Sequence, residues 1–164
     1  DGVPDESDNC PVDANAGQED ADLDEEGDAC DSFTVRRLTM AGRVLHLVGL
    51  VRPGAAFDPG RDALEIRLVA GRGIGFRAVY PAGSLRRNEA GTFFRGRRRG
   101  EAEAQTLTLV RRHDGRFLLH LRSRGEGYGG AATAVDRIRF TVGDETLTTP
   151  VRMVRDGKGV FLFP

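Results

Sequence analysis

Five aspartates near the N-terminus recur at intervals that suit a hard metal ion. Counted from the first of them, they stand at positions 1, 3, 5, 9 and 12 of a twelve-residue window: Asp20, Asp22, Asp24, Asp28 and Asp31. Calcium takes about six to eight oxygen ligands, and a loop of this length supplies most from alternate side chains and one from the backbone carbonyl at position 7. Position 7 is Glu26. The spacing therefore predicts a calcium site built from these six residues.

Part of the same spacing is present upstream. Asp1, Val3, Asp5 and Asp8 have the intervals of positions 5, 7, 9 and 12 of a preceding loop, with Gly2 at position 6, where such a loop turns sharply. Because the donors of both sets are oxygens, we expect calcium in preference to zinc. No stretch of helical period flanks either set, so these are EF-type loops without the helices of an EF-hand.

Residues 1–31 also contain an ordered series of short motifs. Asn-Cys-Pro at 9–11 is followed by Asn-x-x-Gln at 15–18, by alternating aspartates at 20–24 and by Gly-Asp-x-Cys-Asp at 27–31. This series resembles a thrombospondin type 3 repeat. The resemblance implies a calcium-cored, disulfide-stapled segment with little secondary structure, of the kind used in extracellular adhesion and matrix proteins. In bacteria, similar repeats are spacers in surface and outer-membrane proteins.

One position departs from the family pattern. Position 6 of the complete loop is usually Gly, and here it is Glu25. If the backbone there has a positive φ, a residue with a side chain costs about 1 kcal/mol or more. The extra negative charge offsets part of that cost when calcium is bound, so the substitution bears on the affinity of the site.

Cys10 and Cys30 are the only cysteines. The residues alone leave free thiols, a disulfide, a zinc site and a redox pair as alternatives, and the lack of a nearby His disfavours zinc. The resemblance implies that the two cysteines form a disulfide. Closing a loop of this length stabilises a chain by about 3 kcal/mol in the chain-entropy model.

Charge divides the chain into two blocks. Residues 1–32 contain nine Asp and four Glu but no Lys or Arg, a net charge of −13. The remaining residues contain all 24 basic residues and 12 acidic ones, a net charge of +12. The acidic block has only Val3, Val12 and Leu23 as large apolar residues, too few for a core. We therefore predict a calcium-binding segment at 1–32 and a separate domain at 33–164.

The second block is predicted to be all-β. Its short runs alternate apolar and polar residues, turn residues separate them, and no stretch of helical period is long enough to stand alone. Hairpin turns are expected at 113–115 and 156–159. The pattern favours an antiparallel β-sandwich, with a small barrel as the second choice. The expected strands are 33–40, 44–51, 63–70, 74–80, 92–95, 105–112, 116–124, 136–142, 146–153, 151–155 and 160–163.

Few residues of the second block suit catalysis. There is no Gly-x-Ser-x-Gly motif, and Asp58, Asp62 and Glu65 are scattered carboxylates rather than an acid–base pair. His46 and His120 fall within predicted strands, where a structural role is expected. The chain is therefore not expected to be an enzyme.

The densest basic run consists of Arg95, Arg97, Arg98 and Arg99. One interpretation is an anion patch for nucleic acid or for a sulfated or phosphorylated glycan, and the other is a solvated loop. In an extracellular protein, an anionic polysaccharide is a better partner than nucleic acid. The acidic block, from the same or a neighbouring chain, is a further candidate partner.

Together these features predict a non-enzymatic, secreted or cell-surface calcium-binding protein in which a calcium-stiffened spacer joins a β-sandwich used for adhesion or interaction. The alternative is an accessory domain of a secreted enzyme that binds carbohydrate or an anionic polysaccharide. The lack of Trp, with Tyr80 and Tyr128 as the only tyrosines, disfavours a sugar-stacking site.

Expected partners are calcium and either an anionic polysaccharide or another surface protein, and nucleic acid is not expected. No segment reaches the roughly 18 consecutive apolar residues of a membrane span. The chain opens inside an acidic motif without a signal peptide, so we expect a processed or excised fragment, with a bacterial outer surface or periplasm among the compartments.

Overall fold

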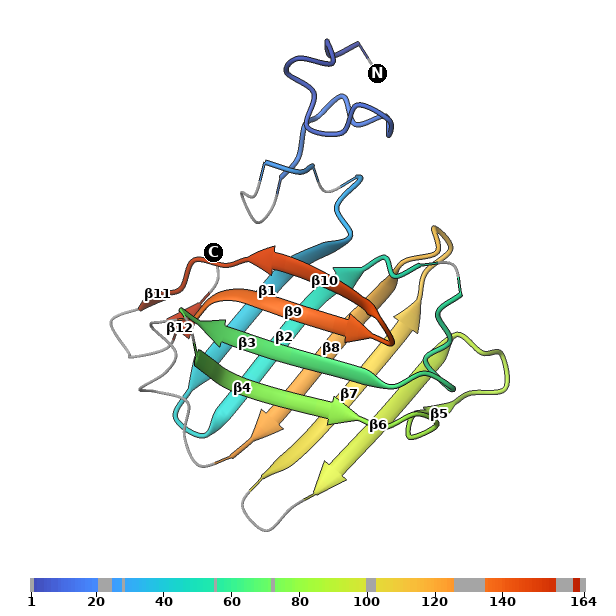
Figure 1. Cartoon of the computed structure of the whole chain (residues 1–164), viewed down its shortest axis with the longest axis vertical. Coiled ribbons are helices and arrows are strands. Elements are labelled where there is room, and N and C mark those ends of the chain that lie inside the picture. The colour runs from blue at the N-terminus through green and yellow to red at the C-terminus, as the bar shows by residue number, and fades with distance from the viewer. Residues whose placement is uncertain are drawn as a thin grey trace.

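The chain folds into two antiparallel β-sheets packed face to face (Figure 1). The computed structural model describes residues 2–20, 25–27, 29–54, 56–71, 73–99, 103–125, 135–155 and 161–162. Within these residues every regular element is a strand. The predicted antiparallel β-sandwich is therefore confirmed, and the barrel that the strand pattern left open is not the architecture.

The larger sheet has eight strands in the order β11-β12-β1-β2-β8-β7-β6-β5. Neighbouring strands far apart in sequence, such as β2 and β8, are joined over the whole length of both. The strands are β1 (Phe33–Ala41), β2 (Val44–Val51), β5 (Arg86–Arg87), β6 (Phe93–Arg99), β7 (Ala104–Arg111), β8 (Phe117–Arg124), β11 (Val154–Arg155) and β12 (Phe161–Leu162).

The smaller sheet has four strands in the order β10-β9-β3-β4. They are β3 (Leu64–Ala70), β4 (Gly73–Tyr80), β9 (Val135–Val142) and β10 (Glu145–Pro150). Figure 1 shows these strands crossing in front of the larger sheet, so one face of each sheet is turned inward and the other outward.

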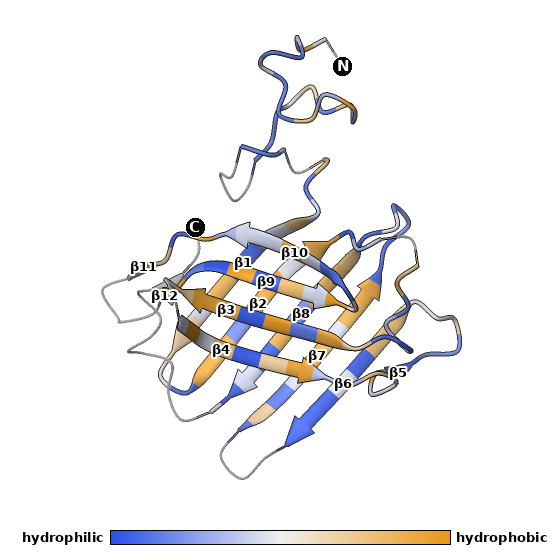
Figure 2. Cartoon of the chain, viewed as in Figure 1, coloured by the Kyte–Doolittle hydropathy of each residue, from blue (hydrophilic) through white to orange (hydrophobic). Residues whose placement is uncertain are grey.

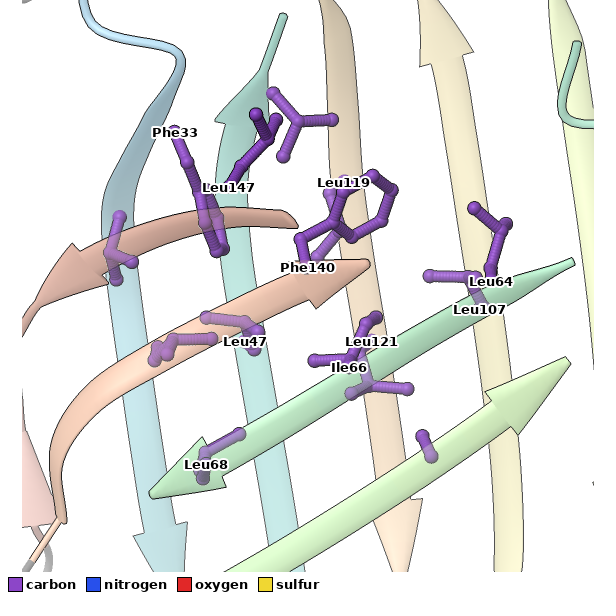
Figure 3. Packing of buried hydrophobic residues seen from close by; sticks show 14 of the residues in the cluster. Phe33, Leu47, Leu64, Ile66, Leu68, Leu107, Leu119, Leu121, Phe140 and Leu147 are labelled. Carbon is purple, nitrogen blue, oxygen red and sulfur yellow. The ribbon is translucent and has the colours of Figure 1, made fainter. Parts of the chain in front are cut away.

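The core lies between the two inner faces. Alternate residues of each strand point inward, and the alternation appears as bands of orange and blue along the strands in Figure 2. Figure 3 shows leucines of the larger sheet beside Leu64, Ile66 and Phe140 of the smaller one. The Phe33 and Phe140 rings meet edge to face with centroids 6.2 Å apart, which joins the two sheets.

Gly96 of β6 lies directly under the ring of Tyr80 of β4. A Cβ atom at position 96 would lie 2.8 Å from the Cδ1 atom of Tyr80 and 3.3 Å from the Cγ atom of Leu85. Contacts this short are repulsive, so the close approach of the two sheets at this edge requires glycine. Gly96 also separates Arg95 from Arg97 in the basic run.

Four strands differ from the sequence-based expectation beyond a shift of one residue. Strand β10 ends at Pro150 instead of residue 153, and β11 begins at Val154 instead of residue 151. Strand β6 runs to Arg99 rather than ending at residue 95, because its backbone pairs with β7 as far as Arg99 opposite Ala104. The arginine run is thus part of a strand and not a loop. Strand β5 was not predicted, since two consecutive arginines show no alternation, and it forms because it pairs with β6.

The N-terminal segment contains no strand in its described part, 2–20, 25–27 and 29–32, and it projects from one end of the sandwich (Figure 1). Side-chain hydrogen bonds replace a core. The amide of Gln18 accepts from the backbone N–H of Asn9 at 2.9 Å and donates to Asp8 at 2.9 Å. Strand β1 begins at Phe33, directly after this segment.

Candidate functional site

Positions 1 and 6 of the predicted calcium loop are joined by a hydrogen bond. The Oδ2 atom of Asp20 accepts a hydrogen bond of 3.1 Å from the backbone N–H of Glu25. Glu25 has φ of 76°, the positive value that was expected to favour glycine. A carboxylate that accepts one such bond keeps acceptor capacity for a metal ion. The Asp20–Glu25 hydrogen bond brings the start of the loop close to its middle, a geometry compatible with ligands that converge on one ion.

The last predicted ligand lies where the segment joins the sandwich. Asp31 is only 4% exposed, and its Oδ1 atom accepts a hydrogen bond of 2.7 Å from the backbone N–H of Phe33. The carboxylate is therefore held in place at the first residue of β1. A carboxyl group held by such a hydrogen bond has a fixed direction in which its oxygens point.

The upstream half-loop is described in part. The Oδ1 atom of Asp8 accepts hydrogen bonds from the Gln18 side chain at 2.9 Å and from the Cys10 backbone N–H at 2.8 Å. These bonds, that from Gln18 foremost, lower the pKa of Asp8, so the carboxylate is charged at neutral pH. Val3 and Asp5 lie nearby in sequence, Asp5 on the surface.

Four predicted ligands lie outside the described residues: Asp1, Asp22, Asp24 and Asp28. Glu26 is described and exposed. Among the described residues, no three His, Cys, Asp or Glu side chains are gathered in a geometry that would hold one metal ion. Asp20, Asp31 and the backbone turn at Glu25 therefore fit a calcium loop, and the aspartates between them stay a prediction from spacing.

Cys10 and Cys30 form a disulfide, the pairing that the family resemblance implies. Cys10 is fully buried, and Gly27 packs against it, since a Cβ at position 27 would lie 2.7 Å from the Cys10 sulfur. The backbone N–H of Gly27 donates to the carbonyl of Asn9 at 3.0 Å. The disulfide closes residues 10–30, which include every position of the complete loop except Asp31, and the Gly27–Asn9 bond ties the same two parts of the segment together.

The basic run is divided between two faces of β6. Arg95, Arg97 and Arg99 point away from the core, while Arg98 points to the opposite side and donates a hydrogen bond of 2.6 Å to the backbone carbonyl of Val79. The structure therefore brings together three members of the predicted anion patch and separates the fourth from them.

The outer face of the larger sheet gathers further basic side chains that the sequence analysis did not assign to the anion patch, among them His46 and His120, for which a structural role was expected. The strand registers place them level with the arginines of β6. We call this set the outer basic face: Arg37, Arg86, Arg95, Arg97, Arg99, Arg122, Arg124, His46 and His120. The only signal in the sequence is the alternation His120-x-Arg122-x-Arg124 in one strand.

The two histidines lie side by side on this face. Their ring centroids are 6.4 Å apart, and both rings are half-buried. Burial lowers the pKa of His46, and the positive charges of Arg122, His120 and Arg37 lower it further. Burial is the main cause of the lowered pKa, and the neighbouring positive charges of this face add to it.

The smaller sheet has a different outer face. There Glu65 is paired with Arg67 at 2.8 Å and with Arg77. The hydrogen bond from Arg67, and then that from Arg77, lower the pKa of Glu65. Among the described residues, no arginine of the outer basic face makes an ion pair. The charge of the larger sheet is therefore not neutralised as it is on the smaller one.

A depression of about 390 Å³ lies at one end of the sandwich, lined in part by Arg61, Asp62 and Glu145. Both carboxylates accept hydrogen bonds from backbone N–H groups. Asp62 accepts from the N–H of Asp58 at 2.9 Å, and Glu145 accepts from the N–H of Gly54 at 2.9 Å. These bonds hold the connecting loops in place.

Comparison of the chain with protein-family models, curated proteins and solved structures finds no match. In the part of the chain that the structure describes, no helix is long and apolar enough to cross a membrane.

Proposed function

We propose that this chain is an extracellular or cell-surface protein in which a calcium-stiffened spacer of the thrombospondin type 3 kind joins a β-sandwich interaction module. The proposal is carried by one observation. An acidic segment without a core is closed by the Cys10–Cys30 disulfide and turns at Glu25, the position where a calcium loop turns. Disulfides persist in oxidising compartments, which supports an extracellular setting.

Calcium would be held by Asp20, Asp22, Asp24, Asp28 and Asp31 with the carbonyl of Glu26. Bound calcium would reduce the electrostatic repulsion among the thirteen acidic residues of the segment, which otherwise opposes its compaction. Because Asp31 is anchored at the start of β1, ordering of the loop would fix the direction in which the segment leaves the sandwich. Binding free energy would then be folding free energy for the segment alone.

Calorimetric titration of the oxidised chain with calcium tests the proposal. We expect saturable uptake at or below millimolar calcium and weaker uptake in Asp24→Ala. The matched control is Asp13→Ala, which removes the same charge but lies outside the ligand pattern. Its ion pair with Arg52 is 3.6 Å long and half exposed, so its loss should alter stability little. Absence of uptake at millimolar calcium, or equal loss in both variants, would contradict the proposal.

The second candidate function is an accessory domain of a secreted enzyme that binds an anionic polysaccharide. It is supported by the outer basic face, where nine basic side chains gather on one surface. Both candidates are non-catalytic roles for this chain, and they differ in the task of the sandwich.

A further inference from the structure

Seven of the nine basic side chains of the outer basic face lie in two level rows across the larger sheet, and Arg99 and Arg124 lie in a third row beside them. One row runs Arg97, Thr106, Arg122, His46, Thr39 from β6 to β1. The next runs Arg86, Arg95, Thr108, His120, Val48, Arg37 from β5 to β1. Apart from Val48, every side chain in the two rows carries a hydrogen-bond donor.

The spacing within a row follows from the sheet. Neighbouring strands lie about 4.8 Å apart, so Arg97 and Arg122, two strands apart, have Cα atoms roughly 10 Å apart. A linear polymer with an anionic group on alternate sugar units could meet both arginines and contact Thr106 between them. Arginine binds carboxylate and sulfate through two parallel N–H donors, which gives direction as well as attraction.

The rows also border a depression in the surface. It has a volume of about 470 Å³, and Arg95, Thr106, Arg122 and Arg124 contribute to its walls. This volume is within the range of roughly 300–1,000 Å³ seen for small-ligand sites. It gives the face a place in which a part of the polymer can be seated rather than only attracted.

We propose that the outer basic face binds a linear anionic polysaccharide laid across the strands, with its carboxylate or sulfate groups on the arginine rows. The proposal specifies the partner of the sandwich in the proposed function, but it requires no calcium. Phe93, at the margin, is the one large aromatic side chain exposed on this face among the described residues, so stacking on neutral sugars is not the basis of recognition.

Two other polyanions fit the charge less well. In the acidic segment of a second copy, bound calcium would neutralise the carboxylates and leave little charge for the arginines. A polysaccharide with more anionic groups than bound calcium ions would keep its negative charge. Nucleic acid is scarce where disulfides persist, and the Cys10–Cys30 bond indicates such a compartment.

The test titrates the full oxidised chain with heparin, a linear polysaccharide with sulfate and carboxylate groups, once with calcium and once with a chelator. Uncharged dextran and duplex DNA are parallel ligands. The variant is Arg97→Gln with Arg122→Gln. The matched control, Arg61→Gln with Arg139→Gln, removes the same charge from elsewhere. Circular dichroism and melting temperature verify that both variants fold.

We expect heparin binding with and without calcium, a loss of at least about tenfold in the face variant, and less than about twofold in the control. The salt dependence of binding should also be weaker in the face variant.

Several results would overturn the proposal. One is an equal loss in both variants, which would mean attraction by net charge alone. A second is heparin binding that disappears when the chelator is added. A third is DNA binding that is as tight as heparin binding or tighter and depends on the same arginines. A fourth is self-association of the chain through this face without heparin binding. Failure of calcium uptake would leave heparin binding in chelator unchanged, so the two proposals fail separately.

Discussion

The Nη2 atom of Arg52, just beyond β2, donates a hydrogen bond of 2.6 Å to the backbone carbonyl of Ala29 in the N-terminal segment. The backbone N–H of Arg52 also donates to the carbonyl of Ser32 at 2.7 Å. One residue of the sandwich thus holds the last turn of the segment from both sides of Cys30 and Asp31. The remainder of the segment projects beyond this attachment (Figure 1).

The described contacts between the segment and the sandwich centre on Arg52, including its half-exposed ion pair of 3.6 Å with Asp13, and this predicts that the sandwich keeps its fold when calcium is removed. Its core is drawn from its own two sheets and the loops between their strands, and among the described residues it includes none of the N-terminal segment. We expect a chelator to expose sites in residues 1–31 to protease while 33–164 stays intact, and the melting temperature of the sandwich to change little. Limited proteolysis with mass spectrometry and calorimetry measure both. Unfolding of the whole chain in one step would place the segment within the cooperative unit of the sandwich.

The positive φ of Glu25 predicts that Glu25→Gly strengthens calcium binding. Glycine adopts this conformation without the cost of about 1 kcal/mol that a side chain brings, which corresponds to about fivefold in affinity. Glu25→Gln is the matched control, because it removes the same charge but keeps the Cβ atom. Calcium titration of the two variants separates backbone from charge. A gain in Glu25→Gln as large as in Glu25→Gly would show that charge, not conformation, limits affinity.

His46 should titrate below its ordinary pKa of 6.5 because of its burial and its positive neighbours. Arg122→Gln removes one of those charges and should raise the pKa of His46, whereas Arg139→Gln on the other sheet should not change it. Proton NMR of the imidazole measures both. A pKa of His46 at or above 6.5 in the unmodified chain would contradict this account of the face.

The same shift has a consequence for stability. The folded chain binds the His46 proton less readily than the unfolded chain, so the free energy of unfolding should decrease as pH falls below about 6.5 and be unaffected by this group above it. His46→Gln should reduce that decrease. Urea unfolding at a series of pH values measures the slope, and an unchanged slope in the variant would remove His46 as its source.

Gly96 and Tyr80 predict opposite effects of two small changes. Gly96→Ala places a Cβ atom 2.8 Å from the Tyr80 ring and should lower the free energy of unfolding by about 1–3 kcal/mol. Tyr80→Phe removes a buried hydroxyl that has no hydrogen-bond partner among the described residues, so it should be neutral or slightly stabilising. Denaturant unfolding checks both. A Gly96→Ala variant as stable as the parent would mean that the sheets can separate at this edge without cost.

The sequence by itself determined the features that depend on neighbouring residues. Alternation of period two defined most strands to within a few residues and thereby the class of fold, because successive side chains of a strand point to opposite faces. The 113–115 hairpin was predicted by its turn residues and is confirmed by the pairing of β7 with β8. The family pattern has Gly at position 6, a residue that tolerates a positive φ, and Glu25 at that position has φ of 76°.

Only the tertiary structure decided which strands are neighbours, and the outer basic face depends on that. Arg97 and Arg122 belong to the consecutive strands β6, β7 and β8, whereas Arg37 belongs to the distant β1–β2 hairpin and reaches the same surface because β2 pairs with β8. The alternation of apolar and polar residues shows which side chains of a strand lie on the same face. It does not show which strand lies beside it, because the backbone hydrogen bonds between strands are the same for any sequence. The arginines could therefore be counted from the sequence, but their convergence on one face could not.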